Sequence, residues 1–261
     1  MPTPNAVAMA RALYVARRNH TPIEPFTDVH RSLTMADGYR IQQELVKLLL
    51  AEGDRVIGHK VGATSKAMQD LIGLDTPDYG PVLASTVFRD GAEVSVGNFI
   101  SPKLEAEIGF VLGERLLGPG ITPEHARRAI SGAVASMEIV DSRIRDWRIR
   151  LADTVADLAS NGAMVASENV VAVTDFDPRL IGMVLSRNGE PIDAGVGAAA
   201  LGDPVAVVAW LANVLGGDGV ALEPGHLILT GALHAAVPML PGDHFLAEFD
   251  RLGEVRISVC D

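Results

Sequence analysis

The sequence is poor in the residue that builds disulfides and thiolate metal sites. It holds one cysteine in 261 residues, Cys260, next to the C-terminal residue. A single thiol can form neither an internal disulfide nor a cage of thiolates around a metal ion. Any metal site in this chain must therefore use carboxylates or histidines.

Positive charge and long apolar runs are also scarce. The chain has 22 Lys and Arg against 33 Asp and Glu, a formal net charge of -11, and no basic block. This balance argues against a nucleic-acid backbone or an anionic membrane as a partner. No uninterrupted apolar run approaches the roughly 18 residues that a bilayer span needs, and no basic leader precedes the N-terminal apolar stretch. We therefore expect a cytoplasmic protein without nucleic-acid or membrane partners.

Several catalytic signatures are missing as well. No Gly-x-Gly-x-x-Gly stands between a strand and a helix, and no Gly-x-Ser-x-Gly occurs. The seven histidines show neither His-x-x-x-His nor His-Glu-x-x-His spacing. These absences argue against a dinucleotide fold, a serine-nucleophile elbow and a zinc peptidase.

What is present is enough apolar material for a sizeable core, since 48% of the residues are hydrophobic. Amphipathic stretches at 5–18 and 34–52 predict helices, and Thr34 opens the second with a capping-box pattern. We expect a single catalytic domain over 1–261 that begins with a mostly helical segment at about 1–54.

After this segment the sequence turns to short β-type runs punctuated by glycine. These runs are VIGHKVG, PVLASTVF, LEAEIGFVL, HLILTG, HFLAEF and EVRISV. Asn188-Gly189 predicts a two-residue hairpin, and Thr122-Pro123 and Asp203-Pro204 are typical helix starts. Strict strand–helix alternation is absent, so we expect a mixed α/β fold.

The run from Leu104 to Leu112 is the most informative for chemistry. In a strand its even positions form one apolar face, while Glu105 and Glu107 lie side by side on the other face. One interpretation is a solvent-facing edge strand that carries two charges. The other is a divalent-cation site, because two enclosed carboxylates repel each other and need a proton or a metal ion.

A third acid from another strand would complete a set of oxygen ligands for Mg²⁺ or Mn²⁺. Glu138 is the natural candidate, since it lies among apolar residues where a lone charge is costly. Asp141 is its competitor.

Lys60 lies within the apolar run from Val56 to Gly62. It is either a solvated outward residue or, if it points inward, a group that meets a carboxylate or becomes a base. Asp78 is a candidate partner, although an Asp after a proline is commonly a turn residue. Ser160 is either a polar residue at a helix end or a hydrogen-bond donor to a substrate.

A cluster of arginines surrounds Trp147 in the sequence. The members are Arg143, Arg145, Arg148 and Arg150. We interpret the cluster as a solvated or subunit-contact face rather than an RNA-binding surface.

Taken together, these segments resemble the 2-hydroxypenta-2,4-dienoate (2-keto-4-pentenoate) hydratase and 4-oxalocrotonate decarboxylase family of the fumarylacetoacetate hydrolase superfamily. The likeness covers nearly the whole chain and rests on ordered motifs at 55–66, 77–80, 105–107, 138–143, 155–160 and 197–202. It implies a fold of the fumarylacetoacetase C-terminal type, a rolled β-core with peripheral helices.

The resemblance also implies roles for individual residues. Glu105, Glu107 and Glu138 would bind the metal ion, Mg²⁺ or Mn²⁺. Lys60 and Asp78 would be the catalytic residues, acting as a coupled proton-transfer pair, while Lys60 and Ser160 would contact the substrate. One departure is Leu158, which stands where the family commonly has Asn.

The segment 141–149, with its Trp, resembles the hydratase branch. That branch adds water to 2-hydroxypenta-2,4-dienoate to give 4-hydroxy-2-oxopentanoate in meta-cleavage catabolism of aromatic compounds. The expected partners are a small 2-hydroxy-dienoate substrate, further copies of the chain, and other enzymes of the pathway. Two alternatives stay open, a 4-oxalocrotonate (2-oxo-3-enedioate) decarboxylase and a non-catalytic partner subunit.

Overall fold

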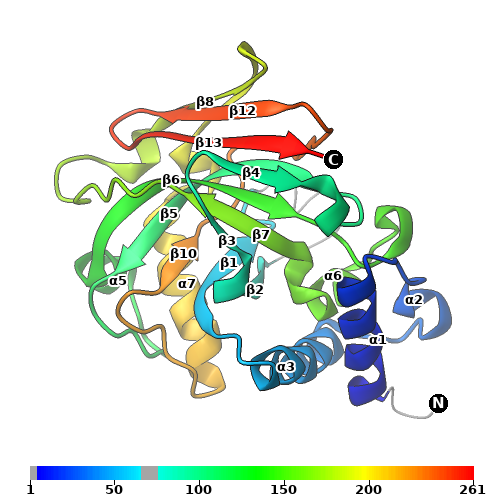
Figure 1. Cartoon of the computed structure of the whole chain (residues 1–261). Coiled ribbons are helices and arrows are strands. Elements are labelled where there is room, and N and C mark those ends of the chain that lie inside the picture. The colour runs from blue at the N-terminus through cyan, green and yellow to red at the C-terminus, as the bar shows by residue number, and fades with distance from the viewer. Residues whose placement is uncertain (1–4, 66–75) are drawn as a thin grey trace.

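Residues 5–65 and 76–261 are described by a computed structural model of the chain (Figure 1). Lys66, the last residue of the first motif, lies outside the described residues. The helices are α1 (Ala6–Asn19), α2 (Phe26–Val29), α3 (Met35–Ala51), α5 (Pro123–Ala129), α6 (Leu151–Ala156) and α7 (Pro204–Gly217). The predicted starts of α3, α5 and α7 are confirmed, because Thr34, Thr122 and Asp203 each accept a hydrogen bond from a backbone N–H in the first turn.

Five of the six predicted β-type runs each correspond to one strand, and further strands lie outside these runs. The described strands are β1 (Val56–Gly62), β2 (Asp78–Leu83), β3 (Val87–Arg89), β4 (Ala92–Ser95), β5 (Lys103–Leu112), β6 (Ile130–Val140), β7 (Asn161–Ala166), β8 (Gly182–Arg187), β9 (Glu190–Val196), β10 (Leu227–Leu229), β11 (Val237–Pro238), β12 (His244–Phe249) and β13 (Gly253–Cys260). The run PVLASTVF is not one strand, because a 3₁₀ turn at Ala84–Thr86 separates β2 from β3.

The described strands form two mixed sheets. The larger has the order β2-β1-β10-β5-β6-β7-β3, with β11 paired to β5, and the smaller has the order β4-β13-β12-β8-β9. Strand β2 contacts β7, so the larger sheet curls back on itself. Figure 1 shows the smaller sheet stacked over the larger one, with α1, α2, α3 and α6 together on one side. The prediction of a mixed α/β fold with a rolled β-core and peripheral helices is confirmed.

The main core lies between the two sheets and extends to α7. It includes Leu104 and Phe110 of β5, Val208 of α7 and Phe245 of β12. The even residues of β5 are fully buried, as the alternation predicts. Strand β5 lies between β10 and β6, so the interpretation of this run as a solvent-facing edge strand is wrong.

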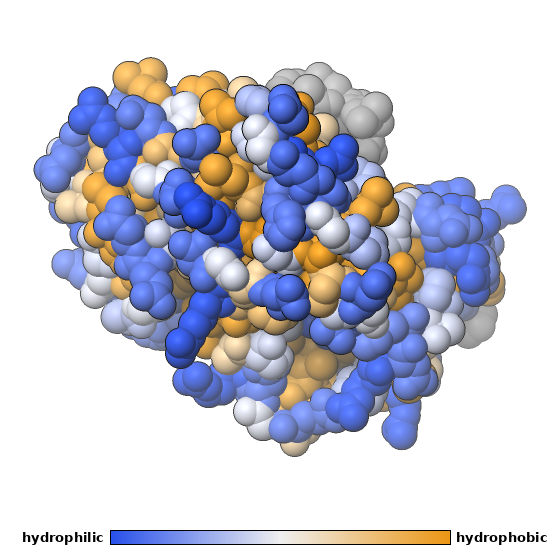
Figure 2. All heavy atoms as spheres, turned by 45° about the horizontal axis from the view of Figure 1, so that its top comes forward, coloured by the Kyte–Doolittle hydropathy of each residue, from blue (hydrophilic) through white to orange (hydrophobic). Residues whose placement is uncertain are grey.

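Glycine turns close the smaller sheet. Asn188 and Gly189 have φ angles of 55° and 85° and connect β8 to β9, as the sequence predicts for a two-residue hairpin. Hydrophilic and hydrophobic side chains alternate over this end of the molecule (Figure 2). The smaller sheet carries half-exposed apolar residues on β8 and β9, such as Val184 and Val196.

One described stretch, Gly197–Gly217, has the length and composition of a membrane span, with a mean hydropathy of 1.6. The helix within it, α7, begins only at Pro204 and has 14 residues. At 1.5 Å per residue it covers about 21 Å, less than the hydrocarbon thickness of a bilayer. Its buried side chains belong to the main core, so α7 is a core helix of this fold.

Candidate metal centre and active site

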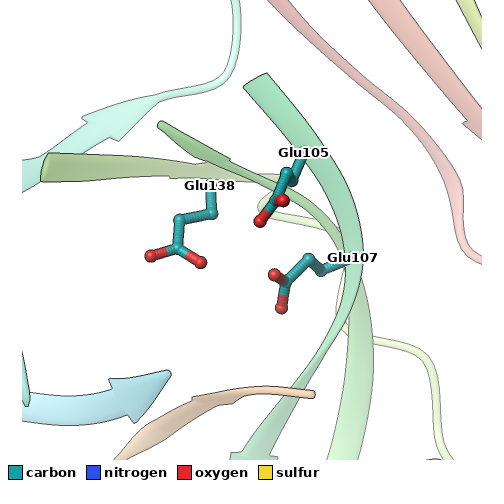
Figure 3. Close-up of side chains that lie close together, drawn as sticks. All are labelled: Glu105, Glu107 and Glu138. Atoms are coloured by element: carbon teal, nitrogen blue, oxygen red, sulfur yellow. The ribbon is translucent and has the colours of Figure 1, made fainter. Parts of the chain in front are cut away.

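Three glutamates from two neighbouring strands meet on one face of the larger sheet. The antiparallel register of β5 and β6 places Glu105 opposite Glu138 and Glu107 opposite Ser136. The three side chains point toward one another (Figure 3). One carboxylate oxygen of each lies within 4.8 Å of the others. The register of two strands therefore assembles the predicted set.

The three carboxyl groups are largely shielded from solvent. Glu107 and Glu138 are 1% and 0% exposed, while Glu105 is half-buried. Burial raises the pKa of Glu105 to about 7, and repulsion from Glu138 adds to this shift. The same two causes raise the pKa of Glu107. Burial also raises the pKa of Glu138, although the Lys60 ammonium opposes it. Such a cluster needs protons or a cation to be stable.

The hydrogen bonds around the cluster indicate where a cation would fit. Oε1 of Glu138 accepts a hydrogen bond of 2.8 Å from Nδ2 of Asn161 and lies 3.6 Å from Nζ of Lys60. Its other oxygen, Oε2, is buried without a hydrogen-bond partner. Oε2 of Glu107 accepts the backbone N–H of Gly231 at 2.8 Å. A buried set of carboxylate oxygens, one of them unpartnered, fits a hard cation such as Mg²⁺ or Mn²⁺.

Lys60 and Asp78 lie together beside this cluster. They are 4% and 6% exposed and come from the neighbouring strands β1 and β2. Both side chains converge over Gly62, because a methyl group there would lie 2.3 Å from Oδ1 of Asp78 and 3.2 Å from Nζ of Lys60. Oδ1 of Asp78 has no hydrogen-bond partner. The structure therefore brings the predicted proton-transfer pair together at the edge of the glutamate cluster.

The charges of this pair depend on their surroundings. Burial lowers the pKa of Lys60, but Glu138 and Asp78 outweigh it, so the pKa is raised and the ammonium form is favoured. Burial raises the pKa of Asp78, with Lys60 opposing the shift. A buried amine and carboxyl group that respond to each other in this way can exchange protons with a ligand.

Ser160 lies in a turn between α6 and β7. Its Oγ is 3.0 Å from Oγ1 of Thr154, and the residue that follows it, Asn161, bonds Glu138. Ser160 is thus next to the cluster, and its contact with substrate stays a prediction. Leu158 is 1% exposed and packs with Leu13 and Leu45 of the helical segment, so it serves the core where the family commonly has Asn.

Asp141 and His59 lie away from the cluster. The carboxylate of Asp141, the competitor of Glu138, accepts the backbone N–H groups of Ile100 and Ser101. His59 is on the opposite face of β1 from Lys60, with its ring 6.2 Å from that of His226. Burial lowers the pKa of His59 to about 3.

The expectation of a solvated or subunit-contact face for the arginine cluster is wrong for Arg143. This residue is 2% exposed, and its Nε lies 2.5 Å from Oδ1 of the fully buried Asp157. Arg145 and Arg148 are exposed and pair with Glu24, as expected for a solvated face.

Sequence reasoning missed three contributors to the cluster. Asn161 and Gly231 donate to the carboxylates of Glu138 and Glu107. Nε2 of His234 accepts the backbone N–H of Ala106, between the two glutamates of β5, at 2.8 Å. A polar residue at the head of the apolar run NGAMVA was the one available signal for Asn161. Gly231 acts through its backbone, which carries no such signal.

The fold and the site together define a class of protein: a rolled β-sheet enzyme core with an enclosed carboxylate site suited to a divalent cation, beside a buried Lys–Asp pair suited to proton transfer. The domain model for the fumarylacetoacetate (FAA) hydrolase C-terminal region matches residues 58–260, and the chain belongs to this family. Every candidate site residue lies within the matched range.

Individual relatives are similar over nearly their whole length. The 2-hydroxyhexa-2,4-dienoate hydratase of Comamonas testosteroni is 40% identical over 248 residues, 94% of each chain. The 2-keto-4-pentenoate hydratase of Paraburkholderia xenovorans (strain LB400) is 40% identical over 247 residues, 95% of this chain and 92% of that one. The 4-oxalocrotonate decarboxylase of Pseudomonas putida G7, solved with magnesium and adipate, matches with a TM-score of 0.95 and 33% identity over 98% and 99% of the two chains.

Proposed function

We propose that this chain is a divalent-metal-dependent hydratase that adds water to 2-hydroxypenta-2,4-dienoate and gives 4-hydroxy-2-oxopentanoate. The observation that carries the proposal is the buried cluster of Glu105, Glu107 and Glu138 with Lys60 and Asp78 beside it. The names of the hydratase relatives at 40% identity support the reaction.

In this proposal Glu105, Glu107 and Glu138 hold Mg²⁺ or Mn²⁺. The unpartnered Oε2 of Glu138 and the raised pKa values of the three carboxyl groups support a cation there, as does the magnesium complex of the similar decarboxylase. A bound divalent ion and the Lys60 ammonium together would balance the three carboxylate charges, and the ion would draw electrons from the 2-oxygen of a chelating substrate.

The chain's own residues then handle the protons. The dienol loses its 2-hydroxyl proton and gains one at C5, which gives the 2-oxo-3-enoate, and water adds its oxygen at C4 while a proton is delivered to C3. Lys60 and Asp78 act as the coupled pair for these transfers, because their side-chain ends converge over Gly62 and Oδ1 of Asp78 is free to accept a proton. Ser160 contributes a hydrogen bond to the substrate.

The test is an ultraviolet assay of dienoate disappearance with product identification, on chelated enzyme resupplied with Mg²⁺ or Mn²⁺. We expect Glu107→Gln to lose turnover through weakened metal binding, whereas Lys60→Met keeps the metal and loses the chemistry. Glu114→Gln, on an exposed residue shortly after β5, is the matched control and should behave like the wild type. Full activity of the metal-free enzyme would contradict the proposal.

A second candidate reaction is decarboxylation of 4-oxalocrotonate. The TM-score of 0.95 to the Pseudomonas putida decarboxylase favours it. Release of carbon dioxide from 4-oxalocrotonate at a higher rate than loss of the dienoate would make this the main activity. A non-catalytic partner subunit is the third candidate, and activity of the isolated chain in either assay would remove it.

We further propose that residues 1–261 act as one catalytic domain, in the cytoplasm, as an assembly of identical chains that can associate with other enzymes of the pathway. Nε2 of Gln42, on α3, donates to the backbone oxygens of Tyr79 and Val155, which supports a helical segment integral to the core. Exposed apolar side chains such as Val29 and Leu180, 78% and 73% exposed, suit contacts between subunits. Light scattering and cell fractionation test these points.

A further inference from the structure

The turn between α6 and β7 has an unusual backbone. Leu158, Ala159 and Ser160 have φ angles of 56°, 52° and 57°, so three consecutive residues with side chains occupy the left-handed region. Left-handed backbone is unfavourable for such residues because Cβ approaches the carbonyl oxygen. All three are buried. A strained conformation of this kind persists only where surrounding contacts hold it.

Arg143 makes those contacts at both ends of the turn. Its Nη2 donates to the backbone oxygen of Asp157, just before the turn, at 2.7 Å. Its Nη1 donates to the backbone oxygen of Asn161, just after the turn, at 3.1 Å. Its Nε also pairs with the Asp157 carboxylate. A planar, buried guanidinium thus fixes both ends of the turn at once, which a lysine cannot do.

A second arginine supports the same point. Arg17 of α1 donates to the backbone oxygens of Asn161 and Gly162 at 3.4 and 3.3 Å. The next residue on α1, Arg18, pairs with Glu52 instead and does not reach the turn in any contact of the described residues.

The end of the turn determines the position of a glutamate in the cluster. With its backbone held by Arg143, Asn161 directs its side-chain amide to Oε1 of Glu138 and leaves Oε2 free. The start of the turn packs on β2, because a methyl group at Gly80 would lie 2.1 Å from the backbone oxygen of Leu158. The turn therefore lies between the strand of Asp78 and the strand of Glu138.

We propose that Arg143 is a positioning residue: it holds the left-handed turn 158–160 in place, so that Asn161 orients Glu138 for a divalent cation. The inference deepens the proposed function and rests on the proposed metal site. In the described part of the chain, the side chain of Arg143 bonds Asp157 and Asn161 and none of the three glutamates.

The experiment uses the protein of residues 1–261 after a chelator has removed bound metal. Calorimetric titration measures the dissociation constant for Mn²⁺, and the melting temperature, kcat and KM are measured alongside. Arg143→Lys keeps a positive charge for the buried Asp157 but cannot bond both backbone oxygens. We expect Mn²⁺ binding to weaken by about tenfold, the usual effect of losing a partner that orients a metal ligand.

A second substitution separates positioning from general stability. Ala159→Gly removes the strain of the turn, because glycine occupies the left-handed region freely. In the Arg143→Lys background it should restore part of the lost Mn²⁺ affinity. Arg251→Gly is the matched control, since Arg251 is an exposed left-handed residue with a φ angle of 69° between β12 and β13. The Arg251→Gly substitution should raise the melting temperature without changing the affinity for Mn²⁺.

The outcomes distinguish this inference from the proposed function. If the wild type binds no Mn²⁺, both the proposed metal site and the proposed role of Arg143 are wrong. Wild-type binding together with unchanged affinity in folded Arg143→Lys, or equal rescue by Ala159→Gly and Arg251→Gly, overturns the role of Arg143 alone. If Arg143→Lys does not fold, Arg17→Ala decides: it should weaken Mn²⁺ binding by about threefold, the worth of a weak hydrogen bond, while Arg18→Ala has no effect. Equal affinity in these two variants overturns the inference.

Discussion

The glutamate cluster should make the metal-free protein less stable than a variant that lacks one of its charges. The perturbation is Glu105→Gln, which imitates the protonated carboxyl group with little change of shape. Glu105 has an ordinary pKa of 4.5, and burial together with Glu138 raises it to about 7 in the folded chain. The folded state therefore binds this proton more tightly than the unfolded state does, and stability falls as the pH rises from 4.5 to 7.

The structure sets the size of the effect. The gap between the two pKa values corresponds to about 3 kcal/mol, and water at the half-buried carboxylate screens part of it. In the presence of a chelator, we expect the free energy of unfolding of Glu105→Gln to exceed that of the wild type by about 2 kcal/mol at pH 8. Near pH 4.5 the two values should be equal.

The assay is urea unfolding of the two proteins in the presence of a chelator at pH 8 and pH 4.5, with Glu114→Gln as the exposed control. Added Mn²⁺ should reverse the order at pH 8, because the wild type gains more from binding: about 2.7 kcal/mol at a free concentration of one hundred times Kd. A chelated Glu105→Gln protein less stable than the wild type at pH 8, or an equal advantage at both pH values, would refute the reasoning.

Two further predictions concern a buried histidine away from the cluster and the pair of Lys60 and Asp78. Burial lowers the pKa of His59 to about 3 from 6.5, so only the unfolded chain takes up this proton in mild acid, and stability falls as the pH drops below 6.5. Between pH 6.5 and pH 5 the free energy of unfolding, measured with urea, should fall by about 2 kcal/mol less in His59→Phe than in the wild type. An identical fall in both proteins would contradict this. Gly62→Ala would place a methyl group 2.3 Å from Oδ1 of Asp78, so kcat should fall about 100-fold while calorimetry finds Mn²⁺ binding intact. Wild-type turnover in this variant would count against Asp78 as a catalytic group.

The sequence allowed the metal-site candidates to be chosen because strand periodicity is a local property. Glu105 and Glu107 share a face by alternation alone, and Glu138 is conspicuous as a charge among apolar residues. What the sequence could not supply was the register that sets Glu138 opposite Glu105, since pairing depends on the whole sheet. The capping signals of α3, α5 and α7 were reliable for the same local reason.

The supports of the site were harder to predict. Nothing in Leu158-Ala159-Ser160 suggests left-handed backbone, which the sequence normally announces with Gly or Asn. Arg143 was expected on the surface with its neighbours because charge alone says nothing of a buried partner such as Asp157. The run PVLASTVF looked continuous, yet its two halves belong to strands at opposite ends of the sheet order.

The pairing of β5 contains a gap with a consequence for how this chain tolerates change. Regular pairing of β10 with β5 ends at Gly109, and β11 resumes it at Leu104, with single backbone hydrogen bonds from Thr230 and Leu233 in between. Between them the backbone N–H of Gly231 bonds the Glu107 carboxylate instead of a strand partner. Residues 230–236 connect β10 to β11 opposite residues 105–108 of β5, so removing three residues from this connection would allow a continuous ladder, and the N–H that now serves Glu107 would be consumed by it. The candidate site therefore requires the present length of this short connection. A chain with a shortened connection would keep its fold and lose activity.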